Sequence, residues 1–250
     1  MQKLGVIFDM DGVLVDSYQA HYESWRRMAQ ARGLDPMNEE QFAATFGRTS
    51  REIIPDFWAG QVAQSEIAQL DALKEAAFRD IIAEDFPEMD GASELLRSLH
   101  EARLLIAVGS SAPVENVQAV LDAMPEAELI SARANGMEVT HGKPHPEVFL
   151  LAARRLGVEC GDCLVVEDAP AGIEAARRAG MAVIALTGTA PREKLSDANR
   201  IVDSLRQITA EDVVKLIRRH NHECQADCDR KSLDVKARLS QQTYGRTPRE

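Results

Sequence analysis

Short apolar runs alternate with amphipathic segments along most of this chain. The apolar runs predict five strands, the last weaker than the others: Leu4–Phe8, Leu104–Val108, Leu164–Val166, Ala182–Leu186 and Ile201–Val202. Segments of helical length and spacing lie between them: Gly91–Glu101, Pro113–Asp122, Pro146–Leu156 and Gly172–Ala179. Because each strand is a continuous apolar run, both of its faces should be buried. Strands that alternate with helices predict an α/β fold, with a parallel sheet covered on both faces.

Residues 17–88 interrupt this alternation. Spacings of three and four place six side chains on one helical face: Tyr18, His21, Tyr22, Trp25, Met28 and Ala29. Gly33 is a typical C-terminal stop for this helix. Further helical segments are expected at Glu39–Thr45, Ser50–Trp58 and Ser65–Ile82, with no clear strand among them. The pattern therefore predicts an all-helical insert after the first strand of the core.

The pattern divides the chain into three parts. The α/β core takes residues 1–16 and 89–219, and the helical insert takes residues 17–88. Residues 220–250 carry few large apolar side chains, so we expect a flexible tail there.

Composition excludes several kinds of partner. The 250 residues carry a formal net charge of −11, which argues against broad binding to nucleic acid or to anionic membranes. No apolar run reaches the roughly 18 residues of a membrane span, and the first run is too short for a signal peptide. We therefore expect a cytoplasmic protein, and a monomer is the simplest state.

The cysteines predict free thiols rather than disulfides. Cys160, Cys163, Cys224 and Cys228 fit a reducing compartment. A metal-binding patch formed by the last two with the neighbouring histidines of the sequence HNHECQADC is the alternative, and a solvated tail is the simpler interpretation.

Polar side chains collect where the predicted strands end. Ligands of open parallel sheets bind at this edge, outside the carboxyl ends of the strands. Asp9 and Asp11, with Gly12, follow the first predicted strand, and Ser110 and Ser111 follow the second. Glu167 and Asp168 follow the third, and a loop adds Lys143. Four carboxylates packed together would repel one another, so we expect a cation among them. Oxygen ligands with an open position suit Mg²⁺.

The remaining groups suit a phosphate. Ser110 and the amides of Ser111 and Ala112 precede a predicted helix, which makes an anion site. Lys143 can place a positive charge on a phosphate or on a carboxylate nucleophile. Together these residues suit phosphoryl transfer to a carboxylate, with a second carboxylate for the proton. Each motif alone is commonly a turn or a helix cap; their conjunction at one sheet edge favours an active site.

Four motifs resemble one known family. FDMDGVLVDS, VGSS, GKPHPEVF and VVEDAPAGIEAARRAG occur in the order found in the haloacid dehalogenase superfamily of phosphohydrolases with a helical cap of the first type. The resemblance covers residues 4 to 210 and implies a Rossmann-like core with a cap domain inserted after the first strand.

The resemblance also implies a role for each matching residue. Asp9 would be the nucleophile that forms an aspartyl-phosphate, and Asp11 the general acid and base. Lys143 would bridge Asp9 and the phosphoryl group, and Gly12 would allow the tight turn. The remaining assignments are Ser110 and Ser111 for the phosphate, and Asp168 and Glu167 with Asp9 and the Asp11 carbonyl for Mg²⁺.

The cap residues bear on the substrate. His21 matches a histidine that β-phosphoglucomutases carry near the acid/base, although a packed helical histidine is the alternative. Arg48 could reach the substrate, and Arg51 could equally be a surface charge. Lys74 is the single lysine of the insert, and we expect it to be solvated rather than the Schiff-base lysine of the phosphonate-cleaving branch.

The resemblance predicts a Mg²⁺-dependent phosphatase of a small phosphorylated metabolite, with a sugar phosphate as the expected substrate. The alternative is a β-phosphoglucomutase, in which a sugar hydroxyl rather than water accepts the phosphoryl group. A non-enzymatic binding protein on the same fold is a minor alternative, since no expected motif residue is missing. Asp11 argues against dehalogenation, because that branch lacks an acid at this position.

Overall fold

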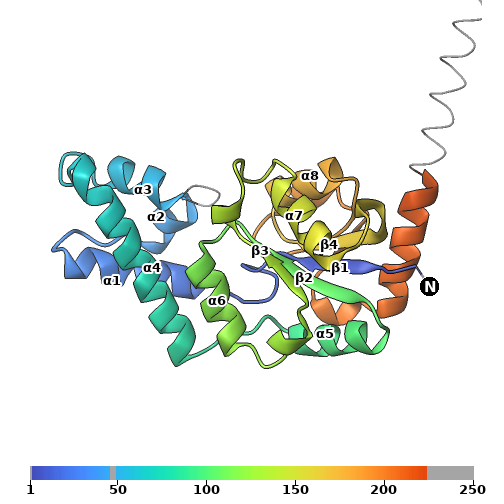
Figure 1. The fold of residues 1–250 in the computed structure, drawn as a ribbon. Helices are drawn as coiled ribbons and strands as arrows, with labels where there is room; N and C mark the ends of the chain where they lie inside the picture. Colours follow the sequence, from blue (N-terminus) through green and yellow to red (C-terminus); the bar gives the residue numbers. More distant parts are fainter. Residues whose placement is uncertain (1, 46–48, 224–250) are drawn as a thin grey trace, which may run out of the picture.

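A six-stranded parallel sheet forms the centre of the computed structural model, which describes residues 2–45 and 49–223 (Figure 1). The strands lie in the order β3-β2-β1-β4-β5-β6. Their bounds are β1 Gly5–Phe8, β2 Leu105–Gly109, β3 Ala132–Ala134, β4 Cys163–Glu167, β5 Ala182–Leu186 and β6 Arg200–Val202. The predicted α/β class and the parallel sheet are confirmed.

Strand register explains why polar residues gather at one edge. Phe8 pairs with Val108 on one side and with Val166 on the other. The next residue of each strand is therefore level with its neighbours, and all the strands point the same way. Asp9 and Glu167 consequently leave the sheet at the same edge.

Two helical layers cover the sheet. Strand residues alternate between them, so that Val6 and Phe8 face one layer and Ile7 faces the other. The first layer contains α5 Ala92–Glu101, α6 Val114–Ala123 and a last helix over residues 210–223. The second contains α7 Glu147–Leu156 and α8 Pro170–Arg178. Burial on both faces is the reason that the central strands read as continuous apolar runs.

Strand β3 is absent from the sequence prediction. It has three residues with the sequence Ala-Arg-Ala and lies at the edge of the sheet, where it pairs only with β2. Such a short edge strand contains no apolar run, so the hydrophobic pattern gives no signal for it.

The described part of the insert contains four α-helices joined by loops. Its helices are α1 Tyr18–Ala31, α2 Glu39–Ala43, α3 Ser50–Phe57 and α4 Ile67–Glu84. They enclose a hydrophobic cluster of their own: Trp25, Met28, Ala29, Met37, Phe42, Ile53, Ile54, Trp58, Ile67 and Leu70. The C-terminal half of α4 instead packs on the main core through Phe78 and Ile82. Figure 1 shows these four helices grouped beyond the carboxyl ends of the strands.

The chain enters and leaves this helical group at one place. The Asp16 amide donates to the Pro87 carbonyl over 2.8 Å, and the Met89 amide donates to the Leu14 carbonyl over 3.0 Å. The two connecting segments are thus held side by side next to the turn after β1.

Short 3-10 turns complete the fold, at Gln64–Glu66, Ala127–Leu129, Gly136–Glu138, Cys160–Asp162, Arg192–Leu195 and Leu205–Gln207. Among the described residues, no helix combines the length and the apolar character needed to cross a membrane.

The last helix continues through residues 220–223. Val213 and Ile217 anchor it in the core, and Asn221 donates to Asp162 over 3.1 Å. Residues 224–250, where most of the expected flexible tail falls, lie outside the described part of the chain, and so do Cys224 and Cys228. Cys160 and Cys163 are free thiols, as expected.

Candidate active site

A lysine with a largely buried side chain joins two acids at the carboxyl edge of the sheet. The Lys143 ammonium donates to Asp9 Oδ1 over 2.5 Å and to Glu167 Oε1 over 2.7 Å. The three side chains are 9%, 10% and 1% exposed respectively, so water screens these charges weakly. Asp9 lies just after β1, Glu167 ends β4, and Lys143 comes from the loop before α7, so three separate segments form this group.

Burial and the opposite charge of the partner shift the pKa values of Asp9 and Lys143 in opposite directions. Burial raises the pKa of Asp9 to about 7, although Lys143 opposes the shift, and the charges of Glu167 and Asp11 add to it. For Lys143, burial alone would lower the pKa, but Asp9 and Glu167 outweigh it and the pKa is raised. One ammonium therefore does not fully compensate the acids around it.

Glu167 holds the turn after β4. Its second oxygen, Oε2, accepts the backbone amides of Asp168 and Ala169, each over 2.7 Å. Gly172 of α8 makes room for this carboxylate, because a Cβ there would lie 1.6 Å from Oε1. Glu167 thus uses both oxygens in fixed bonds, and these bonds orient Asp168.

Asp9, Glu167 and Asp168 form the cluster that fits a hard cation. Each offers a carboxylate oxygen within 4.8 Å of the oxygens of the other two, and all three residues are buried. Burial together with the charges of Glu167 and Asp9 raises the pKa of Asp168 well above its ordinary value. An all-oxygen, buried and under-compensated acid cluster matches the chemistry of Mg²⁺ sites.

Gly12 is required by this cluster as well as by the turn. Its φ is +75°, and a Cβ at this position would lie 2.0 Å from Asp168 Oδ2. The turn after β1 therefore approaches Asp168 so closely that no side chain fits between them. Thr189 lies against the same point and its hydroxyl bonds to Asp168.

Thr189 is a site residue that sequence reasoning missed. It lies after β5 at the same sheet edge, within the sequence LTGT. The other polar groups were identified by their position after the end of a strand, and the same criterion applied to β5 would have found Thr189.

Asp11 points to a histidine of the first insert helix. His21 Nε2 lies 3.3 Å from Asp11 Oδ1, and Lys74 Nζ lies 3.0 Å from His21 Nδ1. Because an ammonium can only donate, Nδ1 accepts from Lys74 and the proton of the neutral ring is on Nε2. His21 therefore donates to Asp11.

The pKa shifts agree with that assignment. Burial and the Lys74 charge lower the pKa of His21, against the effect of Asp11. Burial would raise the pKa of Asp11, but the hydrogen bonds of His21 and Ser17 outweigh it and the pKa is lowered. Asp11 is thus an ionised carboxylate beside a neutral imidazole.

Lys74 is buried, and our expectation of a solvated lysine is wrong. The residue is 4% exposed, and its ammonium donates to Glu75 over 2.9 Å as well as to His21. Phe78, one turn later on α4, stacks on the His21 ring at 4.2 Å between centroids. The buried residues of α4 recur at spacings of three and four: Ile67, Leu70, Lys74, Phe78 and Ile82. That apolar period places Lys74 on the inner face of the helix, and it was the available signal.

The same helix contacts the core through a buried amide. Asn116 of α6, which is 1% exposed, donates to Glu75 over 2.6 Å and accepts from Arg79 over 3.0 Å. The same Glu75 carboxylate also accepts the hydrogen bond from Lys74. A continuous chain of polar contacts therefore runs from α6 through α4 and α1 to Asp11.

Ser110 lies at the expected edge and Ser111 faces outward. Ser110 comes directly after Gly109 at the end of β2, is 1% exposed, and accepts the Ala112 amide on its hydroxyl over 3.0 Å. That amide is thus already bonded within the turn, and the predicted anion site stays a prediction. Ser111 is exposed.

Arg48 lies outside the described residues, so its proposed substrate contact stays a prediction. Arg51 is a surface residue with a 70% exposed side chain, and it pairs with Asp71 over 3.0 Å.

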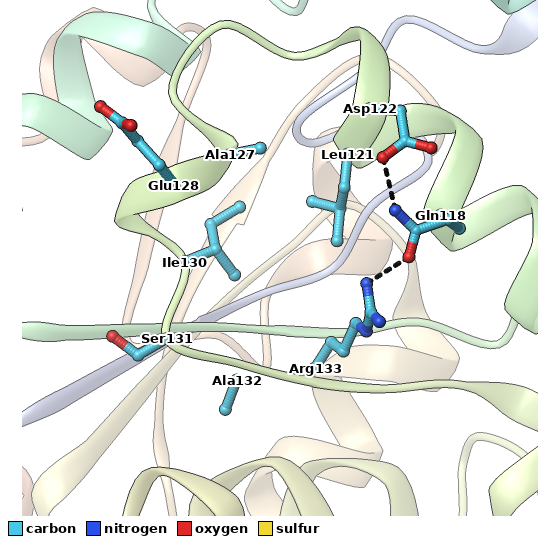
Figure 2. Close-up of a pocket in the computed structure, with 9 residues that line it drawn as sticks. All are labelled: Gln118, Leu121, Asp122, Ala127, Glu128, Ile130, Ser131, Ala132 and Arg133. Atoms are coloured by element: carbon cyan, nitrogen blue, oxygen red, sulfur yellow. Dashed lines mark hydrogen bonds between the residues drawn. The ribbon is translucent and has the colours of Figure 1, made fainter.

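A surface pocket of about 420 Å³ lies elsewhere, between α6 and the segment that leads into β3 (Figure 2). Gln118 lines this pocket, where its side chain donates a hydrogen bond to Asp122 and accepts one from Arg133. None of the site residues above lines this pocket.

Comparison with known proteins identifies the family. The family model for haloacid dehalogenase-like hydrolases matches residues 4–180. Hexitol phosphatase A of Escherichia coli (strain K12) is 33% identical over 84% of this chain and 94% of its own length. Validoxylamine A 7'-phosphate phosphatase of Streptomyces hygroscopicus subsp. limoneus is 32% identical over 81% of this chain and 94% of its own.

A solved structure supports the same placement. The β-phosphoglucomutase of Clostridium difficile is 26% identical, with a TM-score of 0.73 over 88% of this chain and 99% of that one. The chain belongs to the haloacid dehalogenase-like hydrolases, and the predicted fold and enzyme class are confirmed.

Proposed function

We propose that this chain is a Mg²⁺-dependent phosphatase of a small phosphorylated carbohydrate and that it works through an aspartyl-phosphate on Asp9. The observation that carries the proposal is the buried group of Asp9, Lys143 and Glu167, with Asp168 against it and Asp11 two residues along the chain. This geometry supplies a carboxylate nucleophile, a fixed positive charge and a second carboxylate for the proton.

In the first half of the reaction, a carboxylate oxygen of Asp9 attacks phosphorus, and the bond from phosphorus to the metabolite oxygen breaks. That oxygen needs a proton. Asp11, which the free site holds ionised, must first take one up and then gives it to the oxygen, so the dephosphorylated metabolite leaves as an alcohol. Lys143 balances the negative charge of the phosphoryl oxygens and of Asp9, and Ser110 is placed to donate to one of those oxygens.

In the second half, water attacks phosphorus of the aspartyl-phosphate while Asp11 accepts a proton from it. The bond between phosphorus and the Asp9 oxygen breaks, and inorganic phosphate leaves. The ionised state that His21 and Ser17 give Asp11 suits this step, in which Asp11 acts as the base.

The side chains of Asp9 and Asp168 and the carbonyl of Asp11 would hold Mg²⁺, with Glu167 beside them. The bound ion supplies charge neutralisation at the phosphoryl oxygens. Glu167 orients this site through Lys143 and the amides of Asp168 and Ala169.

The helical insert, residues 17–88, acts as a cap in this proposal. Its two connections to the core lie side by side beside the turn that carries Asp11. Movement about this junction would open the site for substrate and close it during chemistry. His21 and Lys74 would then orient Asp11 whenever α1 and α4 are docked.

The names of the relatives support a carbohydrate phosphate as substrate and water as the acceptor. Two relatives at 32% and 33% identity are named as phosphatases, of validoxylamine A 7'-phosphate and of hexitols. The mutase compared above is 26% identical. Phosphatase is therefore the proposed activity, and the mutase is the second candidate because His21 contacts Asp11.

Substitution of the nucleophile tests the mechanism. We expect Asp9→Asn to abolish Mg²⁺-dependent release of phosphate from an aryl phosphate, because an amide cannot form the acyl phosphate. Asp80→Asn, an exposed aspartate on α4, is the matched control and should retain the activity of the parent. Circular dichroism should show that both variants are folded. Substantial turnover by Asp9→Asn would refute the aspartyl-phosphate.

A further inference from the structure

A second group of potential metal ligands lies on the surface of the loop that presents Lys143. In the loop sequence THGKPHPE, His141 lies two residues before Lys143 and His145 lies two residues after it. A turn closed by the His145 amide and the Gly142 carbonyl, 2.9 Å apart, brings the two imidazoles together. Their ring centroids are 4.7 Å apart. The lysine ammonium is directed to Asp9 and Glu167, away from this group.

Glu147, the first residue of α7, completes the group. Its Oε2 lies 3.5 Å from His141 Nδ1 and 3.7 Å from His145 Nδ1. These separations are longer than ordinary hydrogen bonds of about 2.7 to 3.2 Å. They are close to the edge of a tetrahedron around zinc, which is about 3.3 to 3.6 Å for bonds of about 2.0 to 2.2 Å.

A backbone amide of the loop holds the carboxylate in place. The His141 amide donates to Glu147 Oε2 over 3.0 Å. Glu147 is thus held with the two rings beside it. Each of the three residues offers a ligand atom within 4.8 Å of those of the other two.

We propose that His141, His145 and Glu147 bind a borderline divalent cation of the zinc class, as a second metal site distinct from the acid cluster at Asp9. Two imidazoles and one carboxylate select Zn²⁺, Co²⁺ or Ni²⁺ rather than Mg²⁺, which prefers oxygen ligands. The side chains are 65%, 47% and 33% exposed, so the remaining coordination position is open to solvent.

Occupation of this site restrains the loop on both sides of Lys143. His141 and His145 each lie two residues from it in sequence, and Glu147 fixes them to the start of α7. A cation of this class therefore stabilises the loop, independently of the Mg²⁺ proposed at the acid cluster.

Zinc titration of full-length protein tests the site. Cys224→Ser with Cys228→Ser is the parent background, since the C-terminal segment supplies other possible zinc ligands. In saturating Mg²⁺, calorimetry should find a Zn²⁺ binding event in this parent that weakens about tenfold or more in His141→Ala and in His145→Ala. His100→Ala, an exposed histidine of α5, is the control and should bind as the parent does.

Cobalt gives a readout that is independent of affinity. Tetrahedral Co²⁺ with imidazole ligands should produce visible absorption in the parent and lose it in both loop variants. Turnover in Mg²⁺ without zinc should be unchanged in those variants, which shows that the loop is intact. No zinc binding by the parent, or binding that neither loop substitution alters, would overturn the proposal.

Discussion

Asp9 lies in surroundings that favour its neutral form. Burial raises its pKa to about 7 in the metal-free protein, despite the Lys143 ammonium 2.5 Å away. The neighbouring acids Glu167 and Asp11 act in the same direction. A nucleophile must be ionised, so the site needs more positive charge than Lys143 provides, and the proposed Mg²⁺ supplies it.

This shift predicts how the stability of the metal-free protein depends on pH. The unfolded Asp9 carboxyl titrates near 3.8 and the folded one near 7, so the folded chain binds more protons in between. Stability must then fall as pH rises through that window, and the loss is complete above the folded pKa. Asp9→Asn cannot titrate, so the melting temperature of wild type relative to this variant should fall from pH 5 to pH 8 in chelator.

The stabilisation by added Mg²⁺ should instead increase as the pH rises. Since Mg²⁺ competes with protons for the acids, its addition should raise the melting temperature of wild type more at pH 8 than at pH 5. Parallel melting curves for wild type and Asp9→Asn across the pH range would contradict the raised pKa.

At the scale of elements, α4 and α6 connect the insert to the core. The Glu75 carboxylate of α4 accepts hydrogen bonds from Lys74 and from Asn116. Arg79, also on α4, donates to the side-chain oxygen of Asn116. Helix α6 begins shortly after Ser110, and Lys74 leads through His21 to Asp11. We therefore expect the docking of α4 on α6 to affect the orientation of Asp11.

Removing the Asn116 amide tests this coupling. Asn116→Ala leaves Glu75 and Arg79 without their shared partner, and a hydrogen bond to a charged group contributes about 1.5 to 3 kcal/mol. We expect kcat/KM to fall about 10- to 100-fold. Glu115→Gln, on the exposed side of the same helix, should leave kcat/KM unchanged. A variant that loses thermal stability but keeps kcat/KM would show that the contact is only structural.

At the scale of the whole molecule, the proposed chemistry belongs to residues of the core, and we propose that the helical insert selects the acceptor of the phosphoryl group. The acids and Lys143 belong to the core, whereas His21 and Lys74 belong to the helical group with its own hydrophobic cluster. A mutase and a phosphatase share the first set, because both form the aspartyl-phosphate.

Product analysis distinguishes the two activities. Incubation with β-glucose 1-phosphate and a trace of glucose 1,6-bisphosphate should release inorganic phosphate without accumulating glucose 6-phosphate. The physical reason is that water, rather than a second sugar hydroxyl, accepts the phosphoryl group. Rapid formation of glucose 6-phosphate without free phosphate would favour the mutase. Chelation of Mg²⁺ should stop either reaction.

The sequence by itself determined the alternation of strands and helices, the helical insert and the polar positions at the strand ends. These features depend on local periodicity and on the common direction of parallel strands, so Asp9, Ser110, Glu167 and Asp168 could be placed without coordinates. The three-residue strand β3 was not predicted, because it has too few apolar positions to show a hydrophobic period.

Only the tertiary structure decided the contacts between distant segments. Lys74 meets His21 across 53 residues, and Asn116 meets Glu75 across 41. Burial of Lys74 results from packing of α4 against α1 and the core, which turns a charged side chain inward where His21 and Glu75 satisfy it. A Cβ at Gly12 would likewise meet Asp168, which belongs to another segment of the chain. Such pairings depend on how elements pack in three dimensions. The period of α4 can place Lys74 on an inner helix face, but it does not identify His21 and Glu75 as the partners.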